Sequence, residues 1–489
     1  MIDRSGLAAA RARGRLRGLI FALVWLSCAW FGSWEFNPNN STRMFAALSI
    51  VEQGDATIDE YADLTIDKAT FGDHTYLDKA PGMTLMALPA VAFADARFGA
   101  LASDSQPSLW NAAFADFLKL RLRLAASTSV ALLTAIAAML LFDIGRALGG
   151  SNAAGVITAL GYALATPVWG WSTTLFGHAA VAALLVIATW AVWRGTEERT
   201  AAPSTRLAAL AGAALGWAIV VEYSAVIEGT AIGIWALWRL RRWPWPALRL
   251  PLAAAIAAGL AALLPLFAYN LFAFGTLFRV GYQGVVGFDG MNQGLFGLTY
   301  PKPLVLWQIL GGGRRGLLWV APIAVPAAVG LIRLVRTRDT REIGVLAIAI
   351  VVTVLLYNAS YVYWDGGNST GPRHVVPMLG FLALGLAPLW RATHARWAKA
   401  ALLAILAGSI ALNAIIASAE ITSGGLGAFP LWSDVILTRF WPGQLRTIPN
   451  EWWGWSAWEG FGLWAILAGA LLAAILAALW QGRTSTRRA

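Results

Sequence analysis

The sequence has little charge and almost no cysteine. Of its 489 residues only 13% are charged, and Cys28 is the one cysteine, so no intramolecular disulfide can form. It has no Cys/His metal-ligand spacing, no Walker phosphate loop and no dinucleotide-binding glycine motif. No internal repeat is evident, which argues against the inverted-repeat transporter folds. These absences exclude disulfide scaffolds and weigh against nucleotide-dependent and zinc enzymes.

Long apolar runs fill the sequence instead. Hydrophobic residues make up 58% of the chain and the mean hydropathy is +0.61, which is too apolar for a soluble globule. A run of about 18 apolar residues can cross ~30 Å of hydrocarbon. The pattern predicts an all-α polytopic membrane protein with about 12 transmembrane helices (range about 11–13). The expected spans are 16–34, 124–142, 153–168, 177–193, 207–222, 224–238, 250–268, 316–332, 343–357, 375–390, 398–418 and 460–480.

Arginine is concentrated in the short connections between these runs. Twelve crossings put every cluster on one side, which the positive-inside rule makes cytoplasmic, so the net charge of +11 does not indicate a nucleic-acid partner. We expect a protein of the bacterial inner membrane with both ends in the cytoplasm, an uncleaved first helix, and periplasmic loops at 35–123, 269–315, 358–374 and 419–459. The clusters are Arg4 to Arg17, Arg146, Arg194 to Arg206, Arg239 to Arg249, Arg333 to Arg341, Arg391 to Lys399, and Arg483 to Arg488.

The first periplasmic loop, 35–123, is the longest. Within it the 81–101 segment is apolar, but Pro89, Asp95 and Arg97 leave too short a clean run to span, so a re-entrant or interfacial helix is expected. Ser41–Glu52 and Pro81–Ala94 are expected as helices along the membrane surface. No separate soluble domain is visible, and residues 1–489 are expected to form a single transmembrane domain.

Acidic residues crowd this same loop. One interpretation is that an outside loop is solvated and acid-rich because arginine is held inside. The other is chemical: a carboxylate at the membrane surface can deprotonate an acceptor hydroxyl, and a lysine can hold a phosphate leaving group. Glycosyl transfer from a lipid phosphate needs that pairing. The charged residues are Glu52, Asp55, Asp59, Glu60, Asp63, Asp67, Asp73, Asp78, Arg43, Lys68, His74 and Lys79.

The order of one membrane helix, an acidic outer loop and an Asp78-Lys79-Ala80-Pro81 step resembles the GT-C superfamily of glycosyltransferases, which includes protein O-mannosyltransferase-like and lipid A aminoarabinose transferase-like enzymes. WGWSTTLFGHAA at 169–180, RRGLLWVAPI at 314–323 and YVYWDGGNSTGPRHVVP at 361–377 are similar to the same group. The resemblance implies a GT-C-like fold and a periplasmic active site. It also implies transfer of a monosaccharide from a polyprenyl-phosphate donor to a protein, lipopolysaccharide or glycan acceptor, without a cofactor.

The superfamily keeps its catalytic Asp just after the first helix, where this chain has Asn39-Asn40-Ser41-Thr42-Arg43. An amide cannot accept a proton as a carboxylate can, so another acid of the loop has to act as the base. Asp67 is the first candidate, because the adjacent Lys68 would help to keep it ionised, and Asp59 is the second. Lys79 matches the family lysine expected near the donor phosphate.

Further substrate-binding candidates are spread along the chain. Arg373 lies where the chain re-enters the membrane, and a charge there is costly unless it is paired or functional, although an arginine can also snorkel to lipid headgroups. Arg314 and Arg315 have the same alternative, and Glu222 is expected to pair with backbone at an outer turn. His178, at a helix edge, can bind a phosphate or a sugar or can be structural. The remaining candidates are Asp78, Arg43 and Asp365, with His374 beside Arg373.

Two other functions are compatible with the sequence. One is an O-antigen polymerase or ligase, whose key residues would lie in late outer loops. The other is a transporter of lipid-linked substrates, which would place charges at mid-membrane. A divalent ion at Asp73, His74 and Asp78 is conceivable, but no metal is expected.

Overall fold

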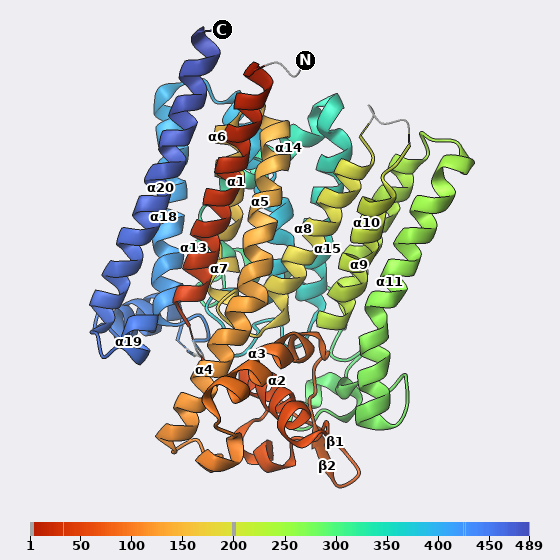
Figure 1. Ribbon diagram of the computed structural model, residues 1–489, viewed down its shortest axis with the longest axis vertical. Coiled ribbons are helices and arrows are strands. Elements are labelled where there is room, and N and C mark those ends of the chain that lie inside the picture. Colours follow the sequence, from red (N-terminus) through yellow and green to blue (C-terminus); the bar gives the residue numbers. More distant parts are fainter. Residues whose placement is uncertain (1–3, 33, 198–201, 424, 426, 489) are drawn as a thin grey trace.

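The structure is a computed structural model that describes residues 4–32, 34–197, 202–423, 425 and 427–488. It is almost wholly helical (Figure 1). The helices are α1 (Arg4–Trp30), α2 (Pro38–Leu48), α3 (Gly82–Phe98), α4 (Ala112–Thr128), α5 (Val130–Gly149), α6 (Asn152–Ala163), α7 (Val168–Trp171), α8 (Gly177–Gly195), α9 (Thr205–Val221), α10 (Ala225–Leu240), α11 (Trp245–Phe274), α12 (Pro303–Leu310), α13 (Leu317–Val320), α14 (Ala324–Arg336), α15 (Arg341–Ser360), α16 (Leu379–Ala383), α17 (Leu386–Ala392), α18 (Arg396–Ala419), α19 (Ile448–Trp452) and α20 (Ala457–Arg488).

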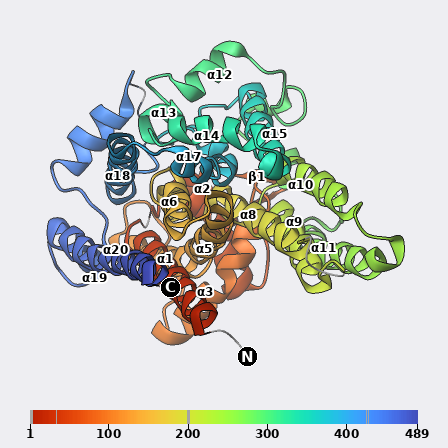
Figure 2. The same cartoon turned by 90° about the horizontal axis from the view of Figure 1, so that it is seen from above.

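The long helices stand side by side, with both ends of the chain at the same end of the bundle (Figure 1; Figure 2 shows it from above). Seven helices among the described residues are long and apolar enough to cross a membrane, and the chain is a multi-pass membrane protein. Every expected span overlaps a helix, but several of those helices, such as α6 with 12 residues, are short. The total of twelve crossings therefore stays a prediction.

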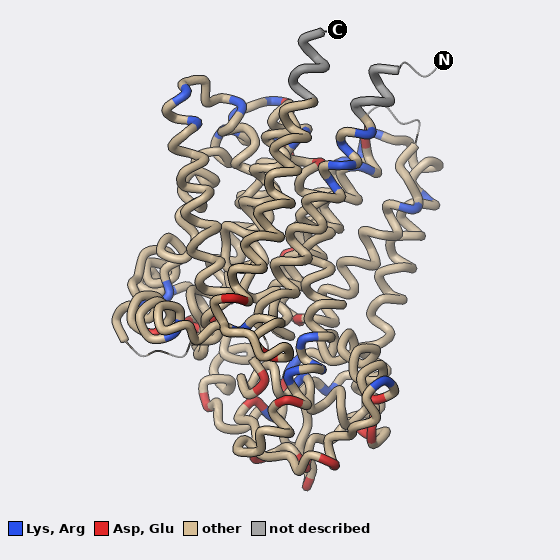
Figure 3. Tube along the Cα trace, turned by 60° about the vertical axis from the view of Figure 1, so that its left-hand side comes forward, with Lys and Arg blue, Asp and Glu red and all other residues tan. Residues whose placement is uncertain are grey.

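Charge is distributed unequally between the two ends of the bundle. Lysine and arginine gather at the end where the two termini lie, whereas most aspartate and glutamate lie at the opposite end (Figure 3). The described parts of the arginine-rich connections that were expected on one side of the membrane lie at one end of the molecule (Figure 3), while Arg199 falls outside the described residues. We call this the basic end.

At the opposite end, the first loop folds into a compact unit of α2, α3, the start of α4 and the hairpin of β1 (Ala69–Phe71) and β2 (His74–Tyr76). We expected α2 to lie along the membrane surface; in the structure, every residue from Asn39 to Leu48 is buried within the protein. The helix packs against α3 and α4, and Phe45 stacks on Tyr61 with ring centroids 4.5 Å apart. Burial of α2 fixes the positions of its polar side chains.

A second outer segment closes over this unit. The chain after α11 contacts the hairpin, since Ala69 bridges Val285 and the amide of Val286 donates to the carbonyl of Lys68 at 3.2 Å. The turn at Gly281–Gly284 lies against the backbone of Leu77 and Asp78. Segments more than 200 residues apart in sequence thus form one layer over the end of the bundle.

Candidate active site

A cavity of about 220 Å³ lies where this layer meets the bundle. Its lining comes from α2, the 65–79 segment, the start of α8, the end of α9, the 282–291 loop and the 361–374 segment. The charged and histidine residues that line it are Arg43, Asp67, Asp78, Lys79, His178, Glu222, Asp365, Arg373 and His374.

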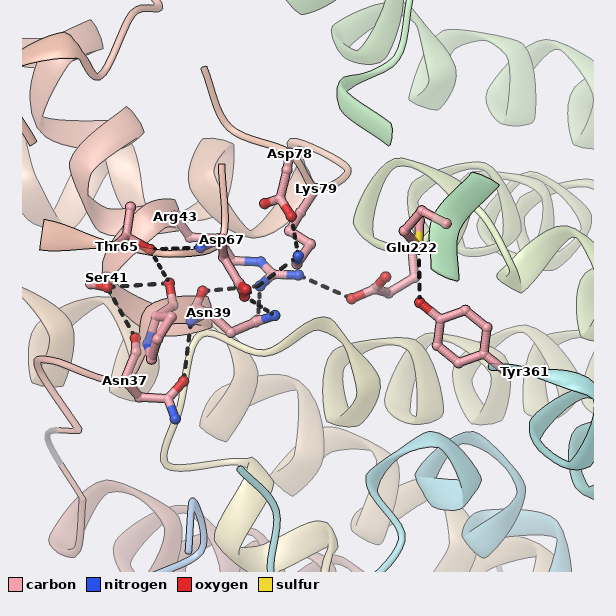
Figure 4. A network of polar contacts seen from close by, with 12 residues as sticks. Asn37, Asn39, Ser41, Arg43, Thr65, Asp67, Asp78, Lys79, Glu222 and Tyr361 are labelled. Carbon is pink, nitrogen blue, oxygen red and sulfur yellow. Dashed lines mark hydrogen bonds and ion pairs between the residues drawn. The ribbon is translucent and has the colours of Figure 1, made fainter. Parts of the chain in front are cut away.

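Helix α2 presents Asn39 and Arg43 to the cavity. The helix begins after Asn37, whose side chain accepts a hydrogen bond from the amide of Asn39, and Pro38 occupies the first turn. Because residues four apart share one helix face, Asn39 and Arg43 lie together, and Arg43 donates to the Asn39 side-chain and backbone oxygens. Arg43 also pairs with Glu222 Oε1 at 3.1 Å (Figure 4). The expected pairing of Glu222 with backbone was therefore wrong.

Asp67 occupies the centre of the polar network in Figure 4. Its Oδ2 accepts a hydrogen bond from the Asn39 side-chain amide at 3.2 Å and lies 3.4 Å from Lys79 Nζ. Burial opposes ionisation of this carboxyl, but the charges of Lys79, Arg373 and Arg43 outweigh it and hold the pKa of Asp67 below its ordinary value. We expected Lys68 to have this role, but its ammonium bonds the carbonyl of Ala62 instead.

Asp78 and Lys79 are adjacent in sequence, and their ion pairs and burial shift the pKa of each. Lys79 Nζ pairs with Asp78 Oδ2 as well as with Asp67, and the two carboxylates raise the pKa of Lys79 despite its burial. Asp78 is 1% exposed and its Oδ1 has no partner among the described residues. Burial therefore raises the pKa of Asp78, although Lys79 opposes the rise. Of the two carboxyls, Asp67 is therefore the one with the lowered pKa.

Arg373 is a half-buried cation without a counter-ion. Its guanidinium lies over the ring of Phe176 with Cζ 5.0 Å from the centroid, and Nε is buried without a hydrogen-bond partner. No ion pair to it occurs among the residues that the structure describes. His178 and His374 stand beside it with ring centroids 5.0 Å apart. This group of nitrogen donors is open to an anion in the cavity.

Two arginines hold the segment that carries Arg373. Arg315 is 1% exposed and donates to the carbonyls of Asp365, at 2.9 Å, and Gly367. Arg314 pairs with the carboxylate of Asp365 at 2.9 Å. Both arginines were also considered as ligands of lipid headgroups. In the structure, Arg315 instead donates to backbone carbonyls and Arg314 pairs with Asp365.

Aromatic residues line part of the cavity, and the sequence interpretation missed them. Tyr282, Phe288, Tyr361 and Tyr363 line it together with Met291, which lies 3.4 Å from the hydroxyl of Tyr361. Aromatic rings with polar tips are suited to contacts with a sugar ring. The YVYW run was a signal for two of them, but nothing in the 282–288 stretch indicated that it folds back on the first loop.

The structure brings seven of the eight predicted site residues into this cavity and leaves Asp59 outside it. Asp59 is half exposed, pairs with His74 Nδ1 at 2.7 Å and accepts a hydrogen bond from the amide of Thr75. Its carboxylate is used within the loop, so the structure does not support Asp59 as a base. The conceivable metal site is not assembled either, since no group of three metal-ligating side chains occurs within the described ranges.

Neither a protein-family model nor a curated protein sequence matches this chain. Among solved structures, it is similar to ArnT from Cupriavidus metallidurans bound to undecaprenyl phosphate, with 16% identity over 83% of this chain and 64% of that chain and a TM-score of 0.47. The apo form of the same protein gives 16% identity, coverages of 80% and 62%, and a TM-score of 0.44. The chain thus spans less than two thirds of the length of these neighbours.

Proposed function

We propose that this protein is a glycosyltransferase that moves a monosaccharide from a polyprenyl-phosphate donor to an acceptor hydroxyl on the periplasmic side of the bacterial inner membrane. The observation that supports this most strongly is the unpaired guanidinium of Arg373 in a cavity shared with Lys79 and the ionised Asp67. A half-buried cation with a buried, unpartnered Nε is unfavourable, and an anionic ligand removes that cost.

The leaving group is the lipid phosphate. Arg373 offers a planar fork that fits two phosphate oxygens, while Lys79 acts as a point charge. The two come from different segments of the chain that line the same cavity, so they can hold one phosphate between them. Charge held in this way stabilises the phosphate as the bond to the sugar breaks, and this electrostatic contribution is commonly the largest in such reactions.

The proton step belongs to Asp67. The acceptor oxygen forms a bond to the anomeric carbon, the bond from that carbon to the phosphate oxygen breaks, and the acceptor proton passes to Asp67. Asn39 and Lys79 hold the carboxylate in place from two directions. A donor phosphate competes for Lys79, which leaves Asp67 less neutralised and therefore more basic when the substrate is bound.

The acceptor is a protein, lipopolysaccharide or glycan hydroxyl. The sugar lies between the phosphate-binding cations and the aromatic side formed by Tyr282, Phe288, Tyr361 and Tyr363.

The test is sugar transfer in membranes that contain polyprenyl-phosphate sugar, comparing the parent with Arg373→Gln and Lys79→Gln. Both variants should lose most transfer while still being inserted and folded. Normal transfer by both variants would contradict the proposal. The matched control is Arg279→Gln, an exposed arginine of the neighbouring loop that does not line the cavity.

A further inference from the structure

A second cavity, of about 490 Å³, lies among α8, α9, α10 and α11. Helix α9 packs along α8 and α11, whereas α10 and α11 make few direct contacts with each other, so a gap remains between them. The lining is almost entirely small or aliphatic. It includes Gly212 and Gly216 on α9, Gly229 and Gly233 on α10, and Gly259 on α11. Water gains few hydrogen bonds in such a space, which suits a hydrocarbon chain.

The cavity opens toward the membrane rather than toward the protein interior. The most apolar window of α11 is only 11% buried, and its lining residues Ile256 and Leu260 are 62% and 59% exposed. On α10, Leu237 is 60% exposed. In a membrane, lipid from the bilayer would therefore fill the gap between α10 and α11.

The lining of the cavity reaches the basic end of the bundle (Figure 1). Its last lining residues are Pro203, Leu240 and Pro251, next to the arginine-rich connections. Arg241 directly follows the lining residue Leu240 at the end of α10, and Arg249 on α11 precedes the lining residue Pro251 by two positions. Both arginines are exposed, and neither forms an ion pair within the described part of the chain. Arg241 lies over the ring of Trp238 at 3.8 Å.

We propose that this cavity binds an anionic phospholipid of the leaflet at the basic end, with one acyl chain between α10 and α11 and the phosphate at Arg241 and Arg249. The apolar lining accommodates the chain, and the unpaired arginines complement the headgroup. Basic pockets between transmembrane helices bind anionic headgroups in this way. The candidate active site lies at the other end of the bundle, so this lipid is distinct from the donor, and the inference does not depend on the proposed function.

The test measures lipid retention by native mass spectrometry of the full-length protein in detergent with added phosphatidylglycerol or phosphatidylethanolamine. One phosphatidylglycerol should remain bound, in preference to phosphatidylethanolamine. The Arg241→Gln/Arg249→Gln variant should weaken retention roughly 10–30-fold, since each arginine near an anionic lipid contributes on the order of 1 kcal/mol. Arg338→Gln, at an exposed arginine of the same end outside the cavity, should retain the lipid as the parent does.

A second variant fills the space. A Cβ at Gly233, which lines the cavity, would meet no atom within 4 Å, so Gly233→Leu places its side chain at an open position and, as a better helix former, should not unfold the protein. It should abolish retention, while Gly233→Ala preserves it. Equal retention of both phospholipids, unchanged retention in the double arginine variant, or displacement of phosphatidylglycerol by undecaprenyl phosphate would overturn the proposal. The last result would mean that the donor's tail fills the gap.

Discussion

The side-chain amide of Asn39 donates a hydrogen bond to Asp67 Oδ2 at 3.2 Å. Asn39 stands where the superfamily that the sequence resembles keeps its catalytic carboxylate, and Asp67 lies 28 residues further along the chain. The loop thus places an acid beside the amide, where the proposed reaction needs a base. This arrangement supports the proposal that the acidic group has moved within the loop and that its place in space has stayed the same.

Replacing Asp67 with Asn should remove the proton acceptor and preserve shape. We expect turnover to fall by roughly 10²–10⁴, the usual contribution of general-base assistance. The measurement is kcat for sugar transfer by purified enzyme. Asp63→Asn, which changes an exposed carboxylate of the same loop, is the matched control and should stay within a few-fold of the parent. If Asp63→Asn loses as much activity as Asp67→Asn, the loss comes from the reduced negative charge of the loop and not from a missing base.

Exchanging the amide of Asn39 and the carboxylate of Asp67 provides a sharper test. In Asn39→Asp/Asp67→Asn the carboxylate returns to α2, where Arg43 already contacts residue 39. This double variant should recover a substantial part of the turnover that Asp67→Asn loses. Asn39→Asp alone should be impaired, because it puts two carboxylates in contact and raises the pKa of one. If the double variant is no better than Asp67→Asn, the two positions are not interchangeable and the relocation idea fails.

The two phosphate-binding cations should differ in their effect on stability. Arg373→Gln removes an unpaired half-buried charge, so the thermal midpoint in detergent should stay the same or rise while the KM for the donor increases. Lys79→Gln leaves Asp67 and Asp78 without their shared cation, so the midpoint should fall. A lower midpoint for Arg373→Gln would show that this arginine is a structural element.

The pH dependence follows from the lowered pKa of Asp67. A carboxyl whose folded pKa lies below its ordinary value of 3.8 stays ionised above that pH, and its contribution to stability and to catalysis is lost as the pH falls through the folded pKa. The acid limb of kcat/KM should therefore lie below about pH 4. The acid limb of kcat should lie at higher pH, because a bound phosphate competes for Lys79. If the acid limbs of kcat and kcat/KM fall at the same pH, the bound phosphate does not compete with Asp67 for Lys79.

Membrane topology is tested with reporters. We expect fusions after Arg488 and within the loop at Asn368 to report opposite compartments, with the former cytoplasmic, because the arginine-rich connections and both chain ends share the basic end. Matching reports would be incompatible with twelve crossings.

Much of the fold could be predicted because hydrophobic length and arginine placement are local signals. Each expected span overlaps a helix, and most of the expected site residues line one cavity. The errors concern contacts distant in sequence. Lys68 was chosen over Lys79 as the counter-ion of Asp67 because adjacency is visible in a sequence and a hairpin between the two positions is not. Burial of α2 and the aromatic side at Tyr282 and Phe288 likewise depend on how separate segments pack.

The close contact between Gly281 and the backbone of Leu77 and Asp78 limits which residues can occupy position 281. A Cβ at this position would lie 2.4 Å from the carbonyl oxygen of Leu77 and 2.9 Å from Cα of Asp78. Any larger residue would push the backbone that carries Lys79, although it lies about two hundred positions away in the chain. We therefore expect natural sequences of this type to keep glycine at 281 wherever they keep the lysine, and to lose the two together in copies that have become inactive.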